Sequence, residues 1–124
     1  MTYLATSINE SPVITDKAGA KLVDVRGRAL KFDGNGAVVL AGEGEAAIGI
    51  GIMTNDENIE AGHDVDIQIK DIGLVYAGGE IAKGANLAAD ASGNLVTAAE
   101  TKAVVAIALE AAATAGVFIK AKLK

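Results

Sequence analysis

Apolar and polar residues alternate along several short stretches of the chain, which is the pattern of half-buried β-strands. The clearest case is residues 64–70, where Val65, Ile67 and Ile69 would face inward and the residues between them would face solvent. Residues 46–52, Ala-Ala-Ile-Gly-Ile-Gly-Ile, carry no charge and place isoleucines on one side and glycines on the other. Glycines inside a strand indicate the close approach of another backbone. Both stretches therefore predict core strands.

Turn residues separate the other candidate strands. The strongest signal is Asp33-Gly34-Asn35-Gly36, because Asp-Gly and Asn-Gly tolerate the positive φ of tight hairpin turns. Residues 42–45 and 78–79 are further breaks, and 54–62 is expected to be a polar loop. The strands predicted around these turns are residues 22–25, 29–32, 37–40, 46–53, 64–70 and 72–77.

The second half of the chain repeats the first. Seven positions have a counterpart 57 residues later, and past the core strand the offset falls to 54, which places a three-residue deletion in a loop. The repeat predicts two similar β units, about 27–70 and 84–124. The matched pairs are Gly27–Gly84, Leu30–Leu87, Asp33–Asp90, Gly36–Gly93, Ile48–Val105, Ile50–Ile107 and Ile52–Leu109, then Gly62–Gly116, Val65–Ile119 and Ile69–Leu123.

An alanine-rich stretch at 98–115 offers an alternative to this all-β interpretation. Alanine is the best helix former, so a helix across 98–115 is possible. The β-branched run Val104-Val105 and the repeat favour a strand at 103–109 instead, with at most short helical turns on either side. The predicted fold is all-β, a small β-barrel or sandwich built from the two units.

Residues 1–20 differ from the rest of the chain because they are polar, contain the only proline and show no sustained period. They are interpreted as an extended N-terminal arm that orders on a partner, in front of a single β domain at 21–124. An ordinary first strand or a frayed terminus is the alternative.

The composition of the chain disfavours several kinds of partner. The chain has a net charge of −5 and a lean aliphatic core with 3% aromatic residues, so nucleic acid is an unfavourable partner and help from an oligomer is expected. It has no cysteine. The sequence shows neither a signal peptide nor an apolar run of membrane-spanning length, which predicts a soluble product made in the cytoplasm and no membrane partner.

No pattern of catalytic, cofactor-binding or metal-ligating residues is recognisable. His63 is the only histidine, and the acidic stretch 55–60 lacks the spacing of a calcium loop. Glu43 and Glu45 flank a glycine turn without a third polar partner, and their charge opposes phosphate binding there. Lys120, Lys122 and Lys124 form an alternating basic edge, which usually discourages aggregation; docking of an acidic partner is the second interpretation.

The second unit resembles a known family. The stretches that carry the resemblance are Gly79-Glu-Ile-Ala-Lys-Gly-Ala-Asn-Leu87, Asp90-Ala-Ser-Gly-Asn-Leu-Val96, Val105-Ala-Ile-Ala-Leu-Glu-Ala111 and Gly116-Val-Phe-Ile119. They are similar to the capsid decoration, or cement, proteins of tailed bacteriophages, and the resemblance covers roughly residues 20–124.

The resemblance implies a tulip-like β domain on the outer capsid surface of a virion. It implies a homotrimer that bridges subunits of the major capsid protein and has no enzymatic activity or cofactor. Terminal arms of such proteins often contact the capsid by adding a strand to an exposed edge. The partner-binding residues expected here are Tyr3, Leu4, Ile8, Val13 and Ile14. A small-molecule or glycan-binding β module and, less favoured, a small hydrolase remain as alternatives.

Overall fold

Residues 11–124 are described by a computed structural model, and they form twelve β-strands and no helix. The all-β prediction is therefore confirmed, and no helix in this part of the chain could span a membrane. The strands are β1 (Val13–Lys17), β2 (Leu22–Val23), β3 (Ala29–Phe32), β4 (Val38–Leu40), β5 (Gly49–Gly51), β6 (Asn58–Ile59), β7 (Asp64–Gln68), β8 (Ile72–Tyr76), β9 (Asn86–Ala89), β10 (Leu95–Thr97), β11 (Ala106–Ala108) and β12 (Phe118–Leu123).

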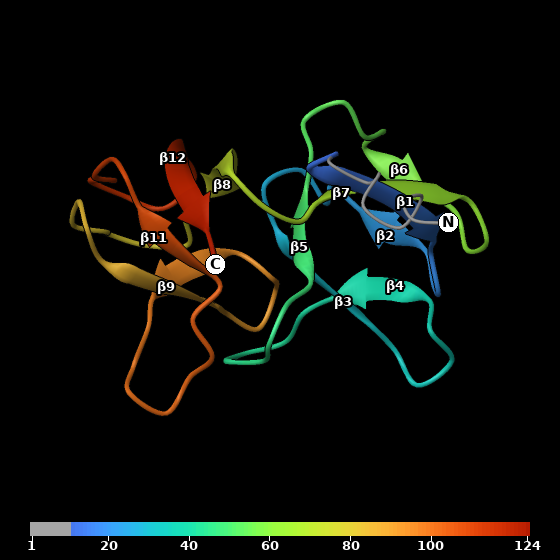
Figure 1. The fold of residues 1–124 in the computed structure, drawn as a ribbon, viewed down its shortest axis with the longest axis horizontal. Helices are drawn as coiled ribbons and strands as arrows, with labels where there is room; N and C mark the ends of the chain where they lie inside the picture. Colours follow the sequence, from blue (N-terminus) through green and yellow to red (C-terminus); the bar gives the residue numbers. More distant parts are fainter. Residues whose placement is uncertain (1–10) are drawn as a thin grey trace, which may run out of the picture.

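Ten of these strands form two five-stranded sheets that lie side by side (Figure 1). The first sheet has the order β1-β7-β5-β3-β4, and the second has the order β8-β12-β11-β9-β10. Strands β2 and β6 form a small third sheet. The two large sheets have the same order once β1 is matched with β8, β3 with β9, β4 with β10, β5 with β11 and β7 with β12. Each half of the chain thus builds the same antiparallel arrangement.

The corresponding hairpin turns are also closed by the same hydrogen bonds. Asp33 in the first half and Asp90 in the second each use Oδ1 to accept the backbone N–H groups two and four residues later, at 2.8 and 3.0 Å. A glycine three residues after each aspartate has a positive φ, 79° at Gly36 and 80° at Gly93. The matched residues of the sequence repeat therefore occupy matched positions in the two sheets.

The core joins the two halves. One cluster of buried side chains belongs to the first half and includes Leu30 and Ile67. The other cluster lies in the second half but also takes in Ala29 and Ile50 from the first. A backbone hydrogen bond from the N–H of Ala29 to the carbonyl of Gly93, 2.8 Å long, crosses the same boundary. The two sheets are therefore packed and hydrogen-bonded to each other.

The two core strands are shorter than the predicted ranges 46–53 and 103–109, since β5 and β11 have three residues each. The glycines of β5 are required because another backbone approaches closely, as predicted from the sequence. A Cβ atom on Gly49 would overlap the carbonyl oxygen of Gln68, and one on Gly51 would overlap that of Val25. Neighbouring backbone fills the space on that side of the strand, as the sequence pattern indicates.

Residues 98–115 contain β11 and turns, and the alternative of a helix there is wrong. Ala106 is fully buried and pairs with Leu87 on one side and Leu123 on the other. Sheet pairing in the core therefore outweighs the intrinsic helix preference of alanine.

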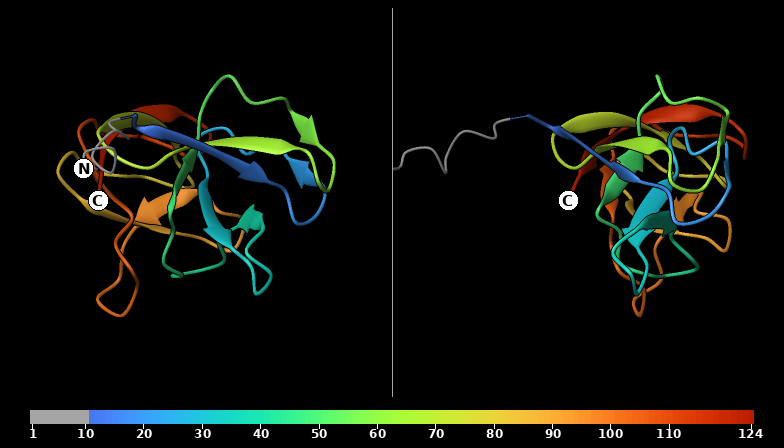
Figure 2. Two further views of the ribbon diagram at one scale, coloured as in Figure 1. Left: turned by 45° about the vertical axis from the view of Figure 1, so that its right-hand side comes forward. Right: turned by 90° about the vertical axis from the view of Figure 1, so that its right-hand side faces the viewer.

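Residues 13–17, which the sequence analysis assigns to the arm, form strand β1. This strand pairs along its whole length with β7, from Val13 opposite Gln68 to Lys17 opposite Asp64, and Figure 2 shows the two strands running side by side. This part of the segment is thus an edge strand of the first sheet, as in the alternative interpretation.

Candidate interaction surface

The predicted partner-binding residues fall into two groups. Tyr3, Leu4 and Ile8 lie outside the described residues. Val13 and Ile14 lie in β1, where both are half-buried and Ile14 packs against the first core cluster. Val13 and Ile14 therefore help to hold β1 on its sheet, and their contact with a partner stays a prediction.

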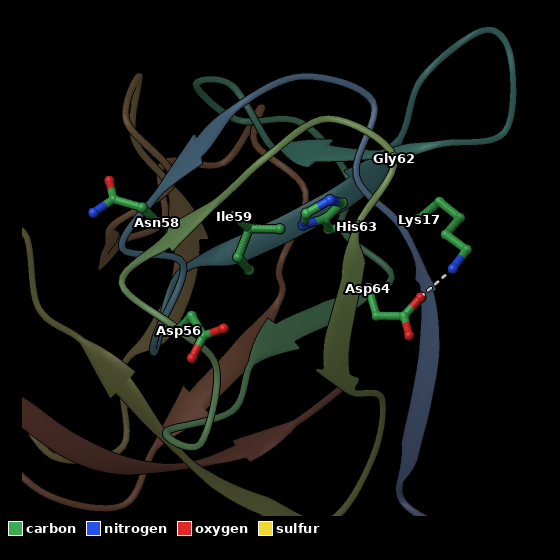
Figure 3. Close-up of a pocket in the computed structure, with 7 residues that line it drawn as sticks. All are labelled: Lys17, Asp56, Asn58, Ile59, Gly62, His63 and Asp64. Carbon is green, nitrogen blue, oxygen red and sulfur yellow. Dashed lines mark hydrogen bonds and ion pairs between the residues drawn. The ribbon is translucent and has the colours of Figure 1, made fainter.

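The only histidine lies on an open polar depression of about 400 Å³ (Figure 3). The walls come from β1, β6, β7 and the loop between the last two, and Lys17 and Asp64 form an ion pair across its rim. Both side chains of that pair are more than 60% exposed, which limits its strength. Within residues 11–124, no group of three or more histidine, cysteine or acidic side chains is arranged to hold a metal ion.

The acidic loop before this depression is held by Asn55, which is buried. The Asn55 side-chain amide donates to the carbonyls of Ile52 and Asp66 at 3.0 and 2.8 Å, and its oxygen accepts the backbone N–H of Asp66 at 2.9 Å. All of its bonds go to the protein backbone. Asn55 is therefore a structural residue that ties the loop to β7.

The paired glutamates are also structural. Glu43 forms an ion pair with Lys102 at 3.2 Å, which joins the two halves of the chain. A hydrogen bond from Lys31 at 2.8 Å, with a second from the backbone N–H of Gly42, lowers the pKa of the Glu45 carboxyl. The two carboxylates thus bind separate lysines and share no acid–base arrangement.

Elsewhere, a charged pair lies in the loop after β2. A hydrogen bond from the Arg26 guanidinium, 2.7 Å long, lowers the pKa of the Asp24 carboxyl. Asp24 has a φ of 51°, so the pair sits at a tight bend of the backbone. This pair stabilises the local conformation, and the charges of Arg28 and Glu57 also act on it.

A different kind of surface lies on β8 and β12. Ile72 and Leu74 of β8 and Phe118 of β12 are large apolar side chains that are 59%, 40% and 40% exposed. They share one face of the sheet, because Phe118 lies opposite Tyr76 and the lysines of β12 lie opposite Ile72 and Leu74. We call the face formed by Ile72, Leu74, Tyr76, Phe118, Lys120 and Lys122 the β8–β12 face.

One end of the β8–β12 face is fixed by an aromatic contact. The rings of Tyr76 and Phe118 meet edge to face with centroids 5.0 Å apart, and the Arg28 guanidinium lies 5.2 Å from the Tyr76 centroid. Tyr76 is therefore occupied by its own neighbours rather than free to stack on a sugar ring. The aromatic end of the β8–β12 face is therefore held by contacts within the chain.

Comparison with known proteins decides the family. Residues 34–123 match the phage cement protein family. The chain belongs to that family. The resemblance on which the sequence analysis relied is thereby confirmed. The cement family is structural and non-enzymatic, and it is associated with the capsid of the virion.

A solved structure shows the same fold. The cement-family chain is similar to the crystal structure of the N base of head fiber gp8.5 of bacteriophage phi29, with a TM-score of 0.67. The similarity covers 90% of this chain and 92% of that chain at 18% sequence identity. No curated protein matches the chain.

The exposed apolar residues of the β8–β12 face were not predicted from the sequence, although a signal is present. Residues 72–77, Ile-Gly-Leu-Val-Tyr-Ala, are apolar at both odd and even positions, which predicts a strand covered on both faces. In the structure only one face of β8 is covered by the core. The other face carries apolar side chains, as the pattern predicts for a covered strand, but it is left exposed.

Proposed function

We propose that this cement-family protein binds the outer surface of a phage head as a homotrimer and stabilises the contacts between subunits of the major capsid protein. Membership of the phage cement protein family over residues 34–123 carries the proposal. The net charge of −5 supports it, because an acidic protein suits a position outside the capsid, away from the packaged DNA.

The mechanism is mass action on the assembled lattice. A protein that binds only the expanded, assembled arrangement of capsid subunits stabilises that arrangement over separated subunits. Three linked copies would bind several capsid subunits at once, so their combined affinity exceeds that of each contact. The cement protein itself needs no catalytic group for this role.

Part of the contact is proposed to come from the N-terminal arm. Tyr3, Leu4 and Ile8 are the apolar residues expected to reach the capsid, where an extended segment can add to an exposed sheet edge. Val13 and Ile14 would contribute only at the base of the arm, because they are already paired in β1.

Deletion of residues 1–10 tests the arm. The truncated protein should keep its fold and trimeric state but bind expanded capsids about tenfold more weakly or worse, which corresponds to a loss of about 1.4 kcal/mol. Co-sedimentation with capsids measures binding, and light scattering measures the mass relative to the 12.4 kDa chain. The cut must precede β1, since a deletion of 1–16 would remove most of a sheet strand.

Two outcomes would count against parts of this proposal. Equal co-sedimentation of truncated and full-length protein would remove the arm from the capsid contact. A full-length protein that scatters as a monomer and fails to sediment with capsids would contradict the proposed function itself.

A further inference from the structure

The two equivalent sheets differ on one face. In the first sheet, the face of β1 and β7 is polar and internally paired: the Thr15 hydroxyl donates to Asp66 at 2.6 Å, and Lys17 pairs with Asp64. The positions equivalent to Thr15 and Asp66 in the second sheet are Leu74 and Lys120. On the same backbone arrangement, the hydrogen-bonded Thr15–Asp66 pair of the first sheet is thus replaced by an exposed leucine and a lysine in the second.

The ammonium groups of the lysines on the β8–β12 face form no ion pair with the described residues, and the one carboxylate bound to this stretch, that of Glu110, accepts the backbone N–H of Lys120 at 2.7 Å. Ion pairs within residues 11–124 involve five other cations, Lys17, Lys21, Arg26, Lys31 and Lys102. Lys120 and Lys122 form none with the described residues. Their charge stands beside exposed Ile72 and Leu74 on a protein whose net charge is −5. This local reversal of sign favours a partner that carries carboxylates.

The backbone of β8 is open on its outer side. Successive residues of an antiparallel strand direct their N–H and C=O groups to opposite sides. Ala77 donates to Val117 and Leu123 donates to Asp71, so the odd-numbered residues of this stretch face β12 and Leu74 faces away from it. β8 is the last strand of its sheet, and no other strand in residues 11–124 pairs with that edge.

The open edge is short and its ends are closed. The Gln68 side-chain amide donates to the carbonyl of Ile72 at 2.8 Å, and the N–H of Tyr76 donates to the carbonyl of Gly27 at 2.8 Å. The backbone groups left for a partner are centred on Leu74. A docked segment would therefore be in register with one position rather than free to slide along the strand.

A groove runs beside this edge. It has a volume of about 410 Å³ and lies between the end of β5 and the start of β8, with Ile52 and Met53 on one wall and Ile72 and Leu74 on the other. Met53 is 41% exposed and extends the apolar surface across the groove. The groove thus offers room for apolar side chains next to backbone groups that accept a strand.

We propose that the β8–β12 face and this groove bind an extended segment of the major capsid protein that carries apolar side chains and flanking carboxylates. This rests on the proposed function and names the surface through which the folded domain meets the capsid. The open edge selects an extended segment, the groove selects apolar side chains, and Lys120 and Lys122 select carboxylates. A second copy docked on the same face about a twofold axis would bring the lysines of both copies together, which is unfavourable. A contact with a different face of a neighbouring copy, as in a trimer, is distinguished by the oligomeric state of the variants.

Substitutions on this face test the assignment. Leu74→Glu and Lys120→Glu should each weaken co-sedimentation with expanded capsids by about tenfold or more, as for residues near the centre of an interface. The matched controls are Val23→Glu, an exposed apolar residue of β2, and Lys83→Glu, an exposed lysine without an ion pair in residues 11–124. Both controls should bind as the wild type does.

Light scattering and thermal unfolding of the same variants separate the outcomes. Loss of capsid binding with unchanged mass and melting supports the proposal. Unchanged capsid binding by both Leu74→Glu and Lys120→Glu overturns it and leaves the lysines as protection against edge pairing. Loss of the oligomer in place of capsid binding overturns it in favour of a contact between copies. A wild-type protein that does not bind capsids overturns both this inference and the proposed function.

Discussion

At the scale of residues, the chain uses glycine for two separable reasons. Some glycines adopt a positive φ that other residues reach only with strain, and some leave room for neighbouring atoms. Gly36 belongs to the first kind only, with a φ of 79° and open space where a Cβ would lie. Gly27 combines both, because its φ is 74° and a Cβ would lie 2.9 Å from the N atom of Tyr76.

The loss of free energy of unfolding caused by an alanine substitution should therefore depend on which of these two constraints the glycine satisfies. Gly36→Ala should reduce the free energy of unfolding by roughly 1–2 kcal/mol, the cost of a left-handed backbone for an L-residue. Gly27→Ala should cost more, since Tyr76 and Phe118 must also shift. Gly34→Ala should stay within about 0.5 kcal/mol of the wild type, because Gly34 has neither constraint. Urea unfolding measures all three, and equal effects at Gly27 and Gly34 would contradict the assignment.

At the scale of elements, the paired hairpins show how a short motif fixes a turn. Asp33 and Asp90 each hold two backbone N–H groups of their own turn, and a glycine with positive φ follows in both. The motif is local, so it could be recognised in the sequence. A first strand within residues 1–20 was only one of two interpretations of the sequence, because the pairing partner β7 lies about fifty residues away and only the completed ladder defines β1.

The two turns should respond alike to loss of the aspartate. Asp33→Ala and Asp90→Ala each remove two hydrogen bonds to backbone N–H groups, which should cost about 1–3 kcal/mol per turn. Asn at either position keeps an acceptor oxygen and should recover most of that loss. Chemical denaturation of the four variants measures the effect. A large loss of stability at one turn and none at the other would contradict this prediction, because the same hydrogen bonds would then contribute differently to the free energy of unfolding.

At the scale of the whole molecule, the shared core predicts that the two halves unfold together. Ala29 and Ile50 of the first half lie in the cluster of the second, and the Glu43–Lys102 ion pair spans both halves. The two halves have a similar architecture, but they bury part of their apolar surface in one shared core.

Substitution of one core leucine in each half tests this cooperativity. Leu30 and Leu87 are equivalent positions and both are fully buried. Leu30→Ala and Leu87→Ala should each cost about 2–5 kcal/mol and shift a single transition. Far-ultraviolet circular dichroism and tyrosine fluorescence should give coincident curves. Separate transitions for the two probes would mean that each half folds alone.

The sequence by itself determined the features that depend on local chemistry or on period. These are the all-β class, the turn at Asp33 with its repeat counterpart at Asp90, the glycines inside the core strand, and the family through residues in the second half. Each is encoded in a few neighbouring residues or in a fixed offset, so no knowledge of distant contacts was needed.

Only the tertiary structure decided which surfaces are left open. The sequence shows Leu74 as one more apolar strand residue, yet its exposure depends on β8 being the last strand of its sheet and on what lies beside it. The same holds for β1, whose residues become a strand only against β7, and for residues 98–115, where burial between β9 and β12 overrides helix preference. Sheet order is set by contacts between residues far apart in the chain, and a local pattern does not contain them.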